Sequence, residues 1–132
     1  MSLIVDTSVI ISVLTNESHK TQIINLTKND ELIAPESLHF EIGNAFSAML
    51  KRKRIGLSQV KKSLEYYYEI PIKLVDIDLE KSLEISYKYN IYAYDAYFIV
   101  CAMNYKSEII SIDSMMIEIA KKENIRIREI LL

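Results

Sequence analysis

The sequence has little glycine, proline or cysteine, and it has no long hydrophobic run. Two glycines and two prolines in 132 residues are far below average usage, so flexible linkers and disordered tracts are not expected. The single cysteine, Cys101, excludes an intrachain disulfide and fits a reducing cytoplasm. No apolar run approaches the ~20 residues of a membrane span. No basic segment precedes the first apolar residues, so we expect neither a signal peptide nor a membrane partner.

Neither sign of charge dominates the chain. Sixteen Lys and Arg residues oppose 18 Asp and Glu residues, which gives a net charge of −2. This balance argues against a uniformly basic surface for nucleic acid but allows a local basic patch. The densest basic run is Lys51-Arg52-Lys53-Arg54, which could contact RNA phosphates without reading sequence. The alternative interpretation is a solvated helix end, where cations favour the helix dipole.

Half of the residues are hydrophobic, enough for the core of one domain spanning residues 1–132. Short apolar runs alternate with helical periodicity, which predicts a three-layer α/β/α fold with a mostly parallel sheet of about five strands. The expected strands are Ser2–Val5, Glu31–Ala34, Ile72–Val75, Glu108–Ser111 and Ile125–Glu129. The expected helices are Ser8–Leu14, Lys20–Lys28, Glu36–Arg54, Ser58–Tyr68, Leu79–Tyr89, Tyr94–Tyr105 and Ser114–Glu123, with a break at residues 16–18.

Three capping residues are expected from the same pattern. Gly56 follows the predicted long helix as a C-terminal cap, and Ser58 begins the next helix as its N-cap. Asp78 precedes another helix as its N-cap.

Four acidic residues stand where an α/β fold could bring them together. Asp6 and Asp113 end short apolar strand-like runs, Glu41 borders the apolar stripe of a helix, and Asp95 opens a long apolar helix. Ligands of such sheets bind beyond the carboxyl ends of the strands, where the strand order reverses. Carboxylates that meet there repel one another, and a cation relieves the repulsion. The pattern therefore favours a divalent metal site.

Each acid also has an ordinary structural interpretation. Asp6, Asp95 and Asp113 could each cap the start of a helix, and Glu41 could be an exposed helix charge. Zinc is disfavoured as the metal, because His19, His39 and Cys101 lack the spacing of zinc ligands. Carboxylate oxygens are instead the ligands that Mg²⁺ and Mn²⁺ prefer.

The order of these motifs resembles the PIN domain over essentially the whole chain, and most closely the VapC-type toxins of prokaryotic toxin–antitoxin pairs. The resemblance rests on Asp6-Thr7-Ser8 after the first strand, the segment from Glu41 to Phe46 after Pro35, Tyr94-Asp95-Ala96-Tyr97, and Ser111-Ile112-Asp113. The N-terminal Asp-Thr-Ser and the Tyr-Asp-Ala-Tyr segment are the more specific motifs. The contexts of the Glu and of the final Asp are looser.

The resemblance implies a Mg²⁺- or Mn²⁺-dependent endoribonuclease with an RNA substrate, a small antitoxin partner and a homodimeric assembly. By matching motifs, Asp6 and Asp95 would be the main metal ligands, while Glu41 and Asp113 would complete the acidic pocket. Thr7 and Ser111 would hydrogen-bond those carboxylates or a phosphate oxygen, and Asn44 matches a frequent polar neighbour of the site. The final Asp, matched here by Asp113, is the most variable member of the four in the family.

Nine tyrosines lie in the second half of the chain. Such rings could stack on unpaired bases, although the edge of the core and a subunit or antitoxin interface is the favoured interpretation. The tyrosines are Tyr66, Tyr67, Tyr68, Tyr87, Tyr89, Tyr92, Tyr94, Tyr97 and Tyr105.

Three other classes of protein compete with a nuclease. A receiver-like signalling domain with an Mg²⁺ pocket normally has adjacent acids after its first strand, whereas Asp6 stands alone here. A haloacid-dehalogenase-type phosphatase would have an acid two residues after Asp6, where this chain has Ser8. A non-catalytic PIN-fold module that binds RNA or protein is the third class, and the presence of all four acids argues against it.

Overall fold

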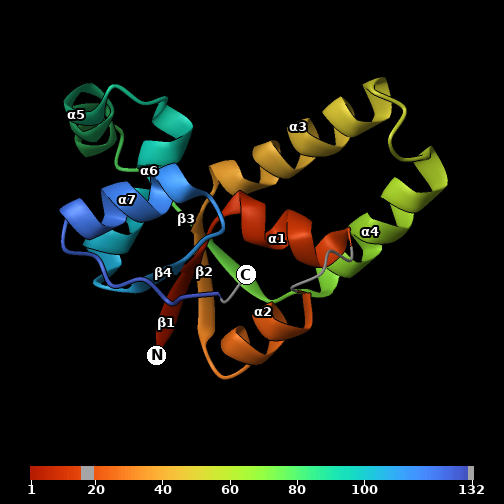
Figure 1. The fold of residues 1–132 in the computed structure, drawn as a ribbon, viewed down its shortest axis with the longest axis horizontal. Coiled ribbons are helices and arrows are strands. Elements are labelled where there is room, and N and C mark those ends of the chain that lie inside the picture. Colours follow the sequence, from red (N-terminus) through yellow and green to blue (C-terminus); the bar gives the residue numbers. More distant parts are fainter. Residues whose placement is uncertain (16–19, 131–132) are drawn as a thin grey trace.

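We describe the fold from a computed structural model, which describes residues 1–15 and 20–130. The predicted break at residues 16–18 lies outside the described residues. The strands are β1 (Ser2–Val5), β2 (Glu31–Pro35), β3 (Ile72–Val75) and β4 (Glu108–Ile110). The helices are α1 (Thr7–Leu14), α2 (Lys20–Thr27), α3 (Ser37–Lys51), α4 (Leu57–Glu69), α5 (Leu79–Tyr89), α6 (Ala93–Tyr105) and α7 (Ser114–Lys122) (Figure 1).

The four described strands form one parallel sheet in the order β3-β2-β1-β4. The central strand β1 is apolar throughout its buried part, with Ile4 paired to Ile33 on one side and to Ile109 on the other. Continuous apolar runs of this kind are typical of strands covered on both faces. The edge strand β3 instead exposes Lys73, a charge that discourages pairing with another sheet.

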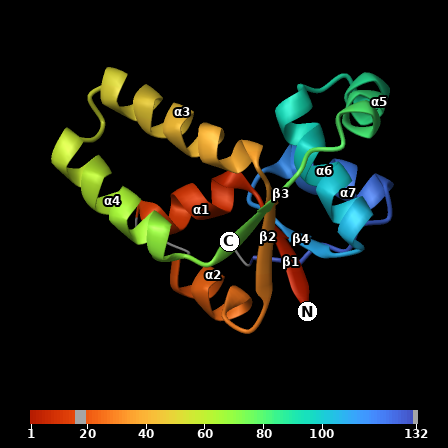
Figure 2. The same cartoon turned by 180° about the vertical axis from the view of Figure 1, so that it is seen from behind.

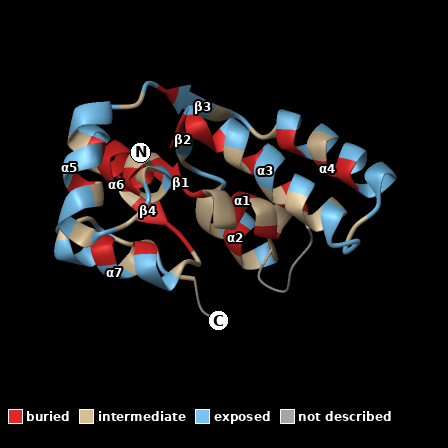
Figure 3. Ribbon diagram, turned by 90° about the horizontal axis from the view of Figure 1, so that it is seen from above, coloured by how far each residue is buried: buried red, intermediate tan, exposed pale blue. Residues whose placement is uncertain are grey.

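Helices cover both faces of the sheet, which gives three α/β/α layers. The helices α5, α6 and α7 lie on one side, and α1 to α4 lie on the other (Figures 1 and 2). Helix α6 is apolar around most of its circumference and packs against β1 and β2 on one side and α5 on the other. Buried positions concentrate along the sheet and the helix faces that meet it (Figure 3).

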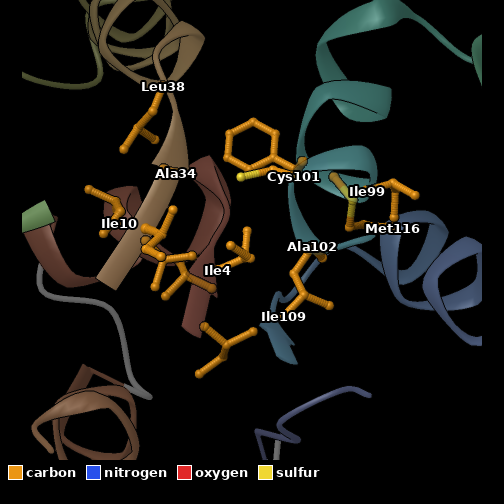
Figure 4. Close-up of a cluster of buried hydrophobic side chains, with 14 of the residues drawn as sticks. Ile4, Ile10, Ala34, Leu38, Ile99, Cys101, Ala102, Ile109 and Met116 are labelled. Carbon is orange, nitrogen blue, oxygen red and sulfur yellow. The ribbon is translucent and has the colours of Figure 1, made fainter. Parts of the chain in front are cut away.

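The core joins the sheet to α6. Ile99 and Ala102 of α6 pack in the same cluster as Ile4 of β1 and Ile109 of β4, and all four are at most 1% exposed (Figure 4). Each such side chain contributes about 1.5–3 kcal/mol through its burial, less for alanine. This packing fixes where α6 begins, and therefore where Asp95 lies.

The predicted fifth strand is reduced to a single parallel bridge between Ile109 and Ile127. Strand β4 has only three residues, so it offers little length for a longer ladder. The segment is nevertheless anchored, because the Arg128 guanidinium pairs with Glu108 at 2.8 Å and also with Asp30.

The predicted boundary between the two long helices was wrong. Helix α3 ends at Lys51 rather than at Arg54, because Lys53 adopts a left-handed conformation with φ 56°. Glycine is the usual residue there, which is why the sequence pointed to Gly56 as the C-terminal cap. Gly56 is instead the N-cap of α4, and Ser58 lies within the first turn of that helix. Asp78 caps α5 as predicted, since its side chain accepts from the Lys81 N–H at 3.2 Å.

No helix within residues 1–15 and 20–130 is both long enough and apolar enough to cross a membrane.

Candidate active site

The four predicted acids line one small cavity beyond the carboxyl ends of the strands. Asp6 follows β1 and Asp113 lies just after β4, while Glu41 lies on α3 after β2 and Asp95 lies in the first turn of α6. The cavity has a volume of about 70 Å³ and is also lined by Thr7, Ser8, Phe98 and Met116. The chain passes from β1 to β2 and β3 on one side of β1, and it then returns to place β4 on the other side. The cavity therefore lies at the point where the strand order reverses, the usual ligand site of such sheets.

Asp6 is the most buried of the four acids, at 3% exposure. Its Oδ1 accepts from Ser8 Oγ at 2.6 Å and from the Val9 N–H at 3.1 Å, which makes Asp6 the N-cap of α1. Its Oδ2 accepts from Ser111 Oγ, which follows the neighbouring strand β4. Burial raises the pKa of Asp6 to about 6, although these three hydrogen bonds oppose the rise. The charge of Asp113 adds to the rise.

Glu41 is held by two hydroxyl groups. Thr7 Oγ1 donates to its Oε1 at 3.2 Å, and Ser37 Oγ donates to its Oε2 at 3.1 Å. Burial raises the pKa of Glu41 to about 7, and the charges of Asp95 and Asp6 contribute to the rise. Glu41 is therefore partly protonated at neutral pH.

Asp95 and Asp113 complete the acidic wall from the starts of two helices. Burial raises the pKa of Asp95, and the charge of Asp113 adds to the rise. The Oδ1 of Asp113 accepts from the backbone N–H groups of Met115 at 2.9 Å and Met116 at 3.3 Å, which caps α7. Asp6, Asp95 and Asp113 thus all lie at helix N-termini, whose partial positive charge favours carboxylates.

The pocket acids make none of the ion pairs found in the described part of the chain. Their mutual repulsion is relieved only partly by hydroxyl and backbone hydrogen bonds. Among the described residues, no three His, Cys, Asp or Glu side chains converge closely enough to hold an ion by themselves. Mg²⁺ keeps several waters and needs only one or two carboxylates, so a spaced, all-oxygen set of acids fits this ion. It does not fit zinc, which takes nitrogen and sulfur ligands.

The other predicted site residues are distributed between this cavity and its surroundings. Thr7 donates to Glu41 and Ser111 donates to Asp6. Asn44 lines an adjoining hollow that shares Thr7 and Glu41 with the cavity. The basic residues Lys51, Arg52, Lys53 and Arg54 lie at and beyond the far end of α3, about 15 Å from Glu41 at 1.5 Å of rise per residue.

Two further hydroxyl groups that hold pocket carboxylates were not predicted from the sequence. Ser37 lies four residues before Glu41, so the two share one face of α3, and this spacing could have identified it. Ser8 lies two residues after Asp6, within the Asp-Thr-Ser motif, where a helix N-cap forms.

The fold and the pocket together define a three-layer α/β/α protein with an acidic site at the strand-order reversal. The chain belongs to the PIN domain family, which matches residues 3–122. No curated protein matches the sequence closely enough to count as a relative.

Solved structures of similar fold have low sequence identity. A Pyrobaculum aerophilum protein has 17% identity and a TM-score of 0.69, over 92% of this chain and 81% of that one. The VapBC2 structure from Rickettsia felis, bound to a DNA fragment from their promoter, has 12% identity and a TM-score of 0.67, over 97% and 98%. A toxin–antitoxin complex from Klebsiella pneumoniae has 16% identity and a TM-score of 0.58, over 85% and 87%. At such identities these likenesses show the fold alone.

The raised pKa of Asp6 predicts a pH-dependent gain in stability for Asp6→Asn. Without metal, the native state holds this proton up to about pH 6, whereas the unfolded state loses it near pH 4. The protonated Asp6 side chain therefore stabilises the native state at low pH, and this stabilisation is lost as the pH rises through about 6. Asparagine caps helices as well as aspartate. We expect Asp6→Asn to raise the metal-free unfolding free energy by about 2 kcal/mol at pH 8 and by little at pH 4.

Denaturant unfolding with a chelator at the two pH values measures this difference. Asp76→Asn, at an exposed position outside the pocket, is the matched control. An equal effect of Asp6→Asn at pH 4 and pH 8 would contradict the burial of an ionised carboxylate.

Proposed function

We propose that the chain is a Mg²⁺- or Mn²⁺-dependent endoribonuclease, the toxin component of a VapBC-type toxin–antitoxin pair. PIN domains are generally nucleases, and this chain belongs to that family. The observation that carries the proposal is the cavity itself, whose described lining residues include four carboxylates and no Lys or Arg side chain. Phosphodiester hydrolysis places further negative charge at such a site, so the site requires a divalent ion.

Each pocket residue has a distinct role in the proposed reaction. Asp6 and Asp95 would hold the ion, with Glu41 and Asp113 binding it directly or through water. When bound, the ion supplies charge relief for the phosphoryl group and acidifies a water. Ser8 and Ser111 fix the orientation of both Asp6 oxygens, since each donates a hydrogen bond to one of them.

In this proposal Glu41 accepts the proton of the attacking water. The water oxygen forms a new bond to phosphorus, the bond to the ribose oxygen breaks, and the leaving oxygen acquires a proton. The pKa of Glu41 is about 7 in the metal-free pocket, and a bound cation would lower it, which keeps Glu41 ionised and able to accept a proton. Thr7 and Ser37 hold its two oxygens in a fixed direction.

Contacts with RNA outside the pocket require positive charge. In this proposal Lys51, Arg52, Lys53 and Arg54 at the α3–α4 corner bind backbone phosphates. The distance of about 15 Å between this corner and Glu41 corresponds to a few nucleotides of single strand. The cytoplasm, where RNA and reduced cysteine coexist, is the compartment of this proposed activity.

Two protein partners complete the proposal. Leu79, Leu83 and Tyr87 follow a spacing of four along α5 and are 55%, 51% and 90% exposed, an apolar stripe suited to a homodimer. A separate apolar hollow of about 230 Å³ lies between α1, α2 and the segment that leads into β3, and it is lined by Val9, Ile23 and other aliphatic residues. It suits an apolar segment of a small antitoxin, a partner that the toxin–antitoxin neighbours also suggest.

The proposed activity is tested by cleavage of mixed single-stranded RNA with Mg²⁺, with Mn²⁺ or with a chelator. We expect cleavage only with metal. We expect Asp95→Asn to lower the rate at least a hundredfold, because it removes a ligand without changing the size of the side chain. Asp76→Asn is the matched control outside the pocket. Equal cleavage with chelator, or undiminished cleavage by Asp95→Asn, would refute the metal-nuclease assignment. RNA binding without any turnover would favour the non-catalytic module.

Replacing Lys51, Arg52, Lys53 and Arg54 with Gln should weaken RNA binding by a similar factor for all sequences. The slope of log affinity against log salt should also become shallower, by up to about one for each phosphate that the variant no longer binds. Fluorescence anisotropy of labelled RNA over a salt series measures both quantities. Lys121→Gln with Lys122→Gln, at another helix end, is the control. An unchanged slope would show that these four basic residues bind no RNA phosphate and form only a solvated helix end.

Sedimentation equilibrium tests the two protein partners. The chain alone should sediment as a dimer, and Leu83→Glu should shift it to the monomer because a charge would be buried at the interface. Leu57→Glu, an exposed leucine of α4, should leave the dimer intact. Co-expression with the product of a small upstream reading frame should yield a larger complex that no longer cleaves RNA. A monomeric wild-type chain would refute the homodimer. Failure to form the larger complex would refute the antitoxin partner.

A further inference from the structure

A second hollow opens directly beside the acidic cavity. It has a volume of about 480 Å³ and is lined by Thr7, Phe40, Glu41, Asn44, Ala45 and Tyr94. Thr7 and Glu41 also line the acidic cavity, so the two spaces adjoin each other. Whatever occupies the hollow therefore lies next to the group that reacts at the carboxylates.

Two aromatic rings reach this hollow from different helices. Phe40 belongs to α3 and is 69% exposed, while Tyr94 belongs to α6 and is 53% exposed. The hydrophobic core uses neither ring. Tyr97 packs edge-on against Tyr94, with ring centroids 5.8 Å apart and an interplanar angle of 86°, which restricts the motion of the Tyr94 ring. Exposed aromatic rings beside a reactive site are suited to stacking on a flat ligand.

The polar lining favours a neutral ligand over an anion. Asn44 lies one helical turn after Phe40, so both project from the same face of α3. Its exposed amide makes no side-chain hydrogen bond with the described residues, and it offers one donor group and one acceptor. Glu41 is the only charged side chain of the lining, and no Lys or Arg is among these residues. A phosphate would be repelled, whereas a nucleobase could pair with the amide.

We propose that this hollow binds one unpaired RNA base adjacent to the scissile phosphate. The base stacks on Phe40 and Tyr94, and Asn44 contacts its edge. Asparagine pairs through two hydrogen bonds with the edge of adenine, so adenine is the preferred base at this position. The inference rests on the proposed ribonuclease function and adds the requirement that the substrate is single-stranded at the cut, because a paired base cannot enter.

Binding is tested separately from catalysis. The Asp95→Asn protein is mixed, in chelator and low salt, with single-stranded RNA 12-mers that carry 2-aminopurine at successive positions. We expect the fluorescence to be quenched at one position, where the probe stacks on an aromatic ring. Adding Phe40→Leu or Tyr94→Leu should remove this quenching and weaken RNA binding about tenfold. Tyr105→Leu, an exposed tyrosine at the other end of α6, should preserve both.

A cleavage assay with the otherwise wild-type chain separates stacking from base reading. Phe40→Leu should raise KM for all RNA sequences about tenfold, and Phe40→Trp should restore it. Asn44→Ala should instead flatten the base preference at a single position beside the cut. An abasic ribose at that position should reduce cleavage of the normal protein but not of Phe40→Leu.

The outcomes distinguish this inference from the proposed function. Metal-dependent cleavage with no position-specific quenching, or with quenching that survives both leucine variants, overturns the base site and leaves the nuclease standing. Position-specific quenching without cleavage by the wild type retains the base site and overturns the nuclease. If Phe40→Leu converts a dimer to a monomer, the hollow is an interface between copies of the chain, and the base site is wrong.

Discussion

The repulsion among four carboxylates at one end of a buried sheet is the constraint on which the rest of the site depends. Asp6 is almost fully buried, and the charges of neighbouring acids add to the raised pKa values of Asp6, Glu41 and Asp95. A fold does not gain stability from such a cluster. The chain keeps it together with hydroxyl donors and helix N-termini, which offset part of the cost and leave the remainder for a cation to relieve.

The architecture explains why the acids stay in place despite this cost. Asp6 and Asp113 follow neighbouring parallel strands, so backbone pairing of β1 with β4 sets their separation. Asp95 is held by α6, whose apolar body is locked between the sheet and α5. Glu41 lies on a helix that starts directly after β2 and is braced by Thr7 from the start of α1. Packing far from the pocket thus holds the like charges together.

The sequence predicted the elements that depend on strong local patterns. The apolar runs of β1 and β4, the cap at Asp78 and the order of the helices all follow from periodicity and turn chemistry. The end of α3 did not, because Lys53 takes a left-handed conformation that is usual for glycine. The prediction of a last strand also failed. Pairing of that segment depends on the three-residue length of β4 rather than on the residues of the segment itself. Tertiary context decided both cases.

For the site, the sequence supplied the four acids and two of the hydroxyl groups that bind them, Thr7 and Ser111, but not the other surroundings. The acids could be chosen because each occupies a strand end or a helix start. Ser37 was missed although it lies four residues before Glu41 within the predicted helix, a local spacing that places both side chains on one face. The hollow lined by Phe40 and Tyr94 was not predictable either, because the two residues lie 54 positions apart and meet only after α3 and α6 have packed on the same end of the sheet.

We propose that the four carboxylates form a divalent metal site. Crystals soaked in Mn²⁺ and measured at the manganese absorption edge test it most directly, because anomalous scattering locates the ion independently of any activity. We expect an anomalous peak in the cavity between Asp6 and Asp95, and no peak there in crystals of the Asp95→Asn variant. An empty cavity in Mn²⁺-soaked wild-type crystals, or manganese bound only elsewhere on the molecule, would contradict the account.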